Sequence, residues 1–221
     1  MALGNNSSSI YLDLRNGKVY RYSKTNEPGT TATQTTKGET RYFYIYDFVE
    51  GHVTNFSTRE EDIQGKVKLK FQIHLKDGND DYVVKMDVDS SYFRMFCSVI
   101  PNIDWNFPVR LIPRIKEEQG VKKSSLITVN NGKPCKFAFT RENPNGKPEV
   151  TFTKNKKGEV IDIDREEEQQ FFFNLIADAK TKLVHPAVAQ PAPTSDRVAT
   201  NVKPAQNFSE DEAFEDDDLP F

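Results

Sequence analysis

Apolar and polar residues alternate along much of the first 163 positions, which is the pattern of half-buried β-strands. In the most regular run, residues 66–75, Val67 and every second residue after it are apolar, while Lys66, Lys68 and Lys70 share the other face. Similar runs predict further strands at 10–14, 19–22, 40–56, 81–88, 107–116, 126–129, 135–140, 150–153 and 160–163.

Two predicted helices and several predicted turns interrupt this pattern of strands. A short helix is predicted at 91–100, after an N-cap at Asp89 or Ser90. A longer one is predicted from residue 165 to about 184, with Asp164 as its cap, acids at its start and lysines near its end, as the helix dipole favours. The Asn16-Gly17 pair predicts a tight hairpin turn, and residues 24–38 a long loop.

The order of these elements predicts a mainly β fold, an oligonucleotide/oligosaccharide-binding (OB) barrel. An OB barrel is a five-stranded Greek key, with a helix between its third and fourth strands. The strands at 40–56, 66–75 and 81–88, the helix at 91–100 and the strand at 107–116 follow that order. The other hairpins and the C-terminal helix are additions to this barrel, and a β-sandwich is the alternative architecture.

A change of composition divides the chain. Residues 1–185 form the predicted OB-like domain, and residues 186–207, without an aromatic side chain, predict a flexible linker. Residues 208–221 form an acidic tail with seven carboxylates and no Lys or Arg, and without those acids the chain's 30 basic residues face 26 acidic ones. An acidic tail on a mildly basic body is typical of proteins that handle nucleic acid, although a solubilising tail has the same charge.

Composition and motifs argue against a membrane protein and against an enzyme. Mean hydropathy is −0.67, and no apolar run approaches the ~20 residues of a membrane-spanning helix. The 2 cysteines and 3 histidines have no metal-ligand spacing, and no glycine-rich phosphate loop or nucleophile motif is present. We therefore expect no catalytic residue, no metal and no cofactor, in a protein that has no signal-peptide pattern and is cytoplasmic.

The strand around residues 42–48 is aromatic on both faces. We expect Phe43, Ile45 and Val49 in the core, which leaves the other face for stacking on unpaired bases. That outward face carries Tyr42, Tyr44 and Tyr46, followed by Phe48. In the alternative, these tyrosines pack under the loop at 24–38 or against another subunit.

A row of cations suggests a phosphate-binding surface. Lys66, Lys68 and Lys70 are spaced at roughly 6.8 Å along a strand, similar to the phosphates of one nucleic-acid strand. The alternative is a solvated face that protects an edge strand. Further candidates for DNA contact are Arg21, Arg41, Trp105, Arg110, Arg114 and Lys116.

The chain ends in an acidic run, an aliphatic residue, Pro and a terminal Phe: Asp216, Asp217, Asp218, Leu219, Pro220 and Phe221. This end closely resembles the C-terminal tip of bacterial single-stranded DNA-binding proteins, which usually have Ile where Leu219 stands. The layout of barrel, linker and tip is also similar, whereas the first 185 residues do not match the bacterial barrel. The resemblance implies a divergent member, with a phage-encoded one as the first candidate. Such a protein coats single-stranded DNA in replication, recombination and repair, and recruits partner enzymes through these six residues.

The main prediction is a non-enzymatic single-stranded DNA-binding protein of the bacterial cytoplasm or nucleoid, or of the host cytoplasm if a phage encodes it. An RNA-binding or RNA-chaperone barrel is the second reading, because the composition of the body does not distinguish ribose from deoxyribose. A protein–protein adaptor is the third, and an enzyme is last. The sequence leaves the oligomeric state, site size, cooperativity and partner enzymes open.

Overall fold

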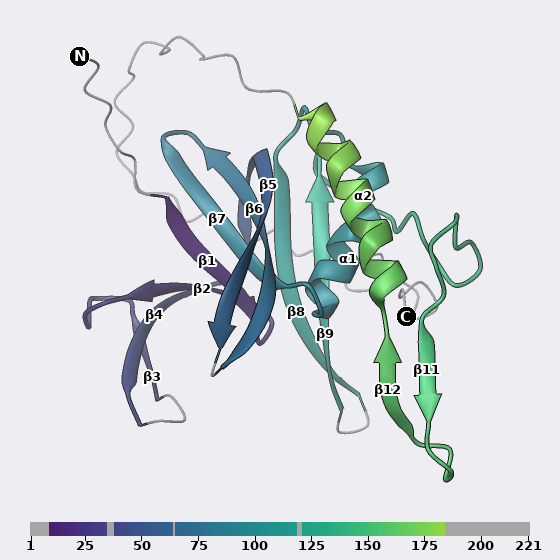
Figure 1. Ribbon diagram of the computed structural model, residues 1–221. Helices are drawn as coiled ribbons and strands as arrows, with labels where there is room; N and C mark the ends of the chain where they lie inside the picture. Colours follow the sequence, from purple (N-terminus) through teal and green to yellow (C-terminus); the bar gives the residue numbers. More distant parts are fainter. Residues whose placement is uncertain (1–8, 35–37, 64, 119–120, 184–221) are drawn as a thin grey trace.

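The computed structural model describes residues 9–34, 38–63, 65–118 and 121–183, and it is mainly β (Figure 1). One large sheet contains β1 (Ile10–Arg15), β2 (Lys18–Ser23), β3 (Thr31–Gln34), β4 (Thr40–Tyr46), β5 (Val49–Ile63), β6 (Lys66–Asp77), β7 (Asp80–Asp87), β8 (Val109–Glu118), β9 (Val121–Asn130) and β10 (Lys133–Pro134). The other elements are α1 (Ser91–Val99), the 3₁₀ turn η1 (Ile100–Asn102), the separate hairpin of β11 (Thr151–Lys154) and β12 (Val160–Asp164), and α2 (Glu166–Lys182).

The large sheet is built around an antiparallel meander of β5, β6 and β7. Its strand order is β10-β9-β8-β5-β6-β7-β1-β2-β4-β3. β1 runs parallel to β7, from Ile10 opposite Tyr82 to Asp13 opposite Lys85, whereas the other ladders of the described residues are antiparallel. The N-terminal hairpin therefore continues the meander sideways, on the side away from β8.

The core lies between this sheet and the two helices, and phenylalanine rings dominate it. Phe71 of β6 stacks on Phe56 of β5, with ring centroids 5.7 Å apart, and meets Phe93 of α1 edge-on at 5.3 Å. Phe93 in turn contacts Phe172 of α2 at 6.0 Å. All four rings are at most 2% exposed, so their burial fixes both helices against the sheet.

The expected cap of α1 is confirmed, whereas the N-cap of α2 lies one residue later than expected. The Ser90 hydroxyl accepts a hydrogen bond from the backbone N–H of Phe93 at 3.2 Å and caps α1. The N-cap residue of α2 is Arg165, whose side chain makes no capping bond, although Asp164 just before it accepts from the backbone N–H of Glu166 at 3.0 Å.

Glu168 of α2 is only 1% exposed, and two cations neutralise it. Lys147 lies at 3.2 Å and Arg165 at 2.8 Å from its carboxylate. Because removing one partner of a buried charge is strongly destabilising, this triad ties the segment before β11 to α2.

Three expectations about the strands are wrong. The predicted loop at 24–38 contains β3, which pairs with β4. Residues 135–140 are not a strand; instead β9 starts earlier and pairs along the whole of β8. The added length of β9, residues 121–125, is mostly polar, and its pairing with β8 rests on backbone hydrogen bonds, which an apolar pattern cannot reveal. Within the described ranges, no ladder closes the sheet into the expected barrel, because β2 pairs onward with β4 and not with β8.

The sheet curls far enough for the turn between β1 and β2 to touch β8. Asn16 and Gly17 have φ values of 50° and 69°, as the predicted tight turn requires. A Cβ on Gly17 would lie only 2.8 Å from the backbone nitrogen of Ile115. The N–H of Gly17 also donates to the hydroxyl of Tyr92 in α1, at 2.9 Å. Close approach of two backbones therefore requires glycine here.

This contact predicts that replacing glycine by alanine destabilises the protein by different amounts in two equivalent turns. Gly132 follows Asn131 as Gly17 follows Asn16, with φ 73°, and no atom lies within 4 Å of its Cβ position. Gly132→Ala should lower the free energy of unfolding by about 1–2 kcal/mol through backbone strain alone. Gly17→Ala should cost about 1–3 kcal/mol more because of the clash. Urea unfolding of the two variants measures both, and equal losses would contradict the contact with β8.

Candidate nucleic-acid interface

One face of the large sheet turns away from the core and combines cations with aromatic rings. A row of directly opposed residues crosses five strands on this face: Gln72 of β6, Lys85 of β7, Asp13 of β1, Tyr20 of β2 and Ile45 of β4. Directly opposed residues share a face of a sheet. We call this surface the outer face; by the same registers it carries Tyr11, Arg15, Tyr22, Phe43, Lys66, Lys68 and Lys70.

Arg15 organises the aromatic end of the outer face. Its guanidinium carbon lies 4.3 Å from the ring centroid of Tyr20 and 4.4 Å from that of Phe43. Tyr20 and Tyr22 both meet Phe43 edge-on, with centroids 5.8 Å apart. Phe43 is 7% exposed, but Tyr22 is 54% and Tyr11 52% exposed. These two tyrosines therefore offer open ring surface on which a planar group can stack.

The basic end of the outer face lies on β6 and β7. Lys66 and Lys68 are exposed near the end of the projecting β5–β6 hairpin. Lys70 is half-buried and lies 2.5 Å from Asp87. The three lysines thus lie on one face of β6, as their spacing predicts, and the carboxylate of Asp87 neutralises the charge of Lys70.

Lys85 joins the two ends. Its ammonium lies 3.5 Å from both Asp13 and Glu61, and 5.9 Å from the ring centroid of Tyr11. An anion that binds here must compete with these carboxylates for the lysine. Because salt screens the attraction of the anion to the lysine, its affinity falls as salt rises.

His74 lies on the same face, two residues beyond Gln72. Burial lowers its pKa, and the positive charge of Lys180 lowers it further. Its Nε2 is 2.7 Å from the hydroxyl of Ser57. Near pH 7 the imidazole is therefore neutral, and the positive charge of the outer face comes from lysine and arginine.

The expected orientation of β4 is wrong. Ile45 is 38% exposed, and Phe43 is buried against Arg15, Tyr20 and Tyr22 rather than in the phenylalanine core. Because β4 pairs with β2 and not with the meander, it lies beyond the helices. Burial of its side chains therefore depends on the side chains of neighbouring strands and not on the helices. Val49 does belong to the core, as expected.

The three predicted tyrosines therefore lie on the face of β4 opposite the outer face. Tyr44 donates a hydrogen bond to Glu27 at 2.5 Å, and the Arg21 guanidinium lies 5.5 Å from its ring centroid. This contact with residue 27 agrees with the alternative in which the tyrosines pack under the loop. Tyr42 is half-buried, and Tyr46 is 42% exposed.

Two of the other predicted DNA contacts, Arg41 and Arg110, also lie on the outer face by register, and each is close to a carboxylate. Arg110 of β8 donates to Glu50 through two nitrogens, at 3.1 and 2.8 Å, and its guanidinium is 4.6 Å from the ring centroid of Phe48. Trp105 is half-buried, and its ring meets Phe56 edge-on at 5.7 Å.

Two more predicted arginines are exposed. Arg114 is on β8, in the stretch that the β1–β2 turn approaches, and Arg41 of β4 lies 3.2 Å from Glu39. The predicted linker at 186–207, the tail at 208–221 and its six terminal residues lie outside the described residues. Their roles stay predictions.

Sequence reasoning missed the aromatic end of the outer face. The signal was present in the first hairpin, where Tyr11, Asp13 and Arg15 alternate with the buried Leu12 and Leu14. The partner strand continues it with Tyr20 and Tyr22. Only the parallel pairing of β1 with β7 places this hairpin beside the lysine row.

No family model, curated protein or solved structure matches this chain. Among the described residues, no cluster of three or more His, Cys, Asp or Glu side chains is arranged to hold a metal ion. Within the same ranges, no helix has the length and apolar character to cross a bilayer.

Two residues on the same face of β4, one buried and one exposed, predict a contrast in stability. Phe43→Ala should lower the free energy of unfolding by about 3 kcal/mol, since it removes a buried ring under Arg15. Ile45→Ala, at an exposed site on the same face, should cost less than about 1 kcal/mol. Thermal or urea unfolding measures both losses. Similar large losses of stability for the two variants would show that Ile45 is also buried in a core.

Proposed function

We propose that this chain binds single-stranded DNA on the outer face with little base preference, without catalysis, and recruits partner enzymes through its C-terminal tip. The observation that carries the proposal is one sheet face on which the open rings of Tyr11 and Tyr22 lie beside Arg15, Lys85 and the lysine row. Rings that stack on unpaired bases and cations that follow the phosphates are the usual means of binding single strands, for which single-stranded DNA-binding proteins are the standard example.

The order of elements supports an OB-like arrangement. β5, β6 and β7 form a meander, α1 follows β7, and β8 returns to pair with β5. β1 pairs with β7, so this N-terminal strand takes the position of the fifth strand of an OB barrel. An OB barrel binds oligonucleotides on its second and third strands, and β6 and β7, the counterparts here, carry the lysines of the outer face.

The tip supports the second half of the proposal. Phe221 offers a ring and a terminal carboxylate at one point, and Pro220 restricts the backbone before it. A partner needs an apolar pocket with a basic rim, and Asp216, Asp217 and Asp218 steer the encounter.

Binding should depend on the outer face and not on the opposite face of the same sheet. Tyr11→Ala and Tyr22→Ala should each weaken binding of a short dT oligomer by about 1–3 kcal/mol, the contribution of one stacked base. Tyr46→Ala, a tyrosine of similar exposure on the opposite face, is the matched control and should change binding little. Fluorescence titration at fixed salt measures all three.

An oligomer short enough for one protein copy keeps contacts between copies out of this measurement. If Tyr46→Ala lost affinity and the other two variants did not, the proposed face would be wrong. Equal affinity for duplex and single strands would contradict stacking altogether, and a matched RNA oligomer that binds more tightly would favour the RNA-binding reading.

Two truncations separate the roles proposed for the tail. Deleting residues 219–221 removes the terminal ring but leaves every acid, so partner recruitment should be lost with little change in DNA affinity. Deleting residues 209–221 removes the seven acids and should tighten DNA binding, most of all at low salt. Pull-down of replication and repair enzymes, with DNA titration of both truncations, tests this. Partners retained after the three-residue deletion would show that the resemblance of the tip is misleading.

A further inference from the structure

The β11–β12 hairpin exposes an apolar face. Phe152 lies opposite Ile163, Ile161 is two residues before Ile163, and Val160 lies opposite Lys154, so all four apolar side chains fall on one side. They are 44–64% exposed. The other side is polar, with Thr151, Thr153, Asp162 and Asp164. A two-stranded sheet with an open apolar face is marginal by itself and marks a docking surface.

The tip of this hairpin is basic. Lys154, Lys156 and Lys157 are exposed there. The one carboxylate in the turn, Glu159, accepts a hydrogen bond from the side chain of Asn155 at 2.6 Å. The hairpin therefore presents an apolar face that ends in positive charge.

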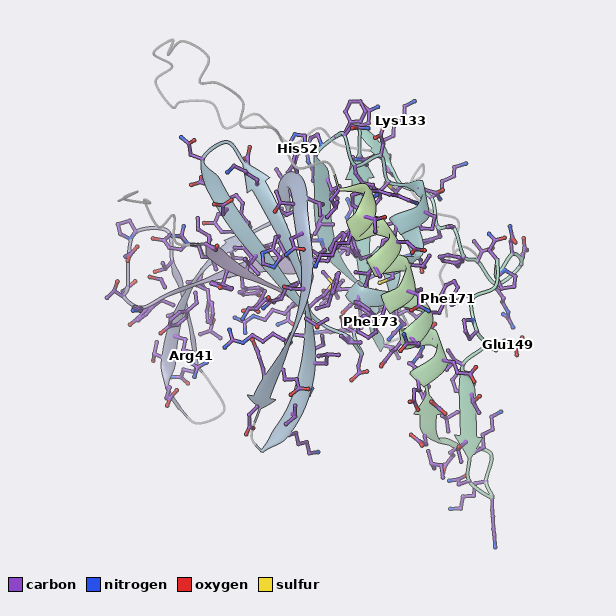
Figure 2. All side chains as sticks on the ribbon, turned by 45° about the horizontal axis from the view of Figure 1, so that its top comes forward. Arg41, His52, Lys133, Glu149, Phe171 and Phe173 are labelled. Atoms are coloured by element: carbon purple, nitrogen blue, oxygen red, sulfur yellow. The ribbon has the colours of Figure 1, made fainter. Side chains whose placement is uncertain are left out.

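An apolar cavity of about 440 Å³ lies on the opposite side of the molecule. Its walls include Ile10, Leu12, Val49, Tyr46 and Phe48. Its rim carries Asp77 and Asp80 from the β6–β7 turn, Glu50, which is paired with Arg110, and the cation Arg21. In Figure 1 this turn is at the upper left and the β11–β12 hairpin at the lower right. Figure 2 shows the same separation, with Glu149, just before β11, far from the strands that line the cavity.

We propose that the β11–β12 hairpin of one copy of this chain docks into this cavity of the next copy. The apolar face fills an aromatic and aliphatic cavity, and the lysines of the tip meet Asp77 and Asp80. The two surfaces differ and lie at opposite ends, so the contact is heterologous and joins copies head to tail instead of closing a twofold dimer. The chain's own acidic tail is a poor occupant of the cavity, because the rim has the same sign of charge.

A charge-swap experiment tests this contact without DNA, and therefore independently of the proposed function. Sedimentation velocity of the full chain over a range of concentrations should show self-association that weakens with salt. K156E/K157E and D77K/D80K should each weaken self-association more than about tenfold, because like charges then meet across the contact. An equimolar mixture of the two variants should associate again. The acidic hairpin of K156E/K157E then meets the basic cavity of D77K/D80K, and the unchanged hairpin of D77K/D80K meets the unchanged cavity of K156E/K157E.

K66E/K68E is the matched control, because it makes the same charge change at another projecting hairpin and should leave self-association unaltered. Deleting residues 209–221 should also preserve it. A chain that stays monomeric at every concentration would overturn the proposal, as would a mixture that fails to associate. Association lost on deleting the tail would show that the tail, not the cavity of a second copy, occupies the hairpin.

Discussion

The parallel pairing of β1 with β7 is the constraint on which the rest of the structure depends. The two strands are about 70 positions apart in the sequence, and four residue pairs hold them in register. Leu12 and Val84, which are directly opposed, are both buried, so the pairing is anchored in the core. Shifting the register by one residue would turn Leu12 to solvent and Tyr11 inward, and would remove the outer face and a wall of the cavity together.

The two faces of the sheet are stabilised by different interactions. Toward the helices, phenylalanine rings exclude water, and the core continues from β5 through α1 to α2. On the outer face, the contacts are ion pairs and rings under an arginine, of which Lys85 and Arg15 are the centres. Such contacts are individually weak in water, so a ligand can replace them at small cost without disturbing the core.

The proposed DNA surface and the proposed contact between copies use separate parts of the molecule. The outer face spans the middle strands of the large sheet, whereas the hairpin is a separate two-stranded sheet and the cavity is lined mainly by side chains of the opposite face, such as Leu12, Val19 and Tyr46. A contact between copies at the hairpin and the cavity would leave the outer face of each copy open to a long, flexible polyanion.

The sequence by itself determined the features that depend on neighbouring residues. The Asn16-Gly17 turn follows from positive φ values, the start of α1 from the hydroxyl of Ser90, and the inward face of β6 from a period of two. Tertiary structure decided the rest. β4 is aromatic on both sides, so only its pairing with β2 determined that Phe43 is buried and Ile45 exposed. Val67 is apolar yet 69% exposed, because the β5–β6 hairpin extends past the helices that would cover it. The outer face joins residues from β6, β7, β1, β2 and β4, and burial and pairing at that distance are properties of the folded sheet, which no local pattern contains.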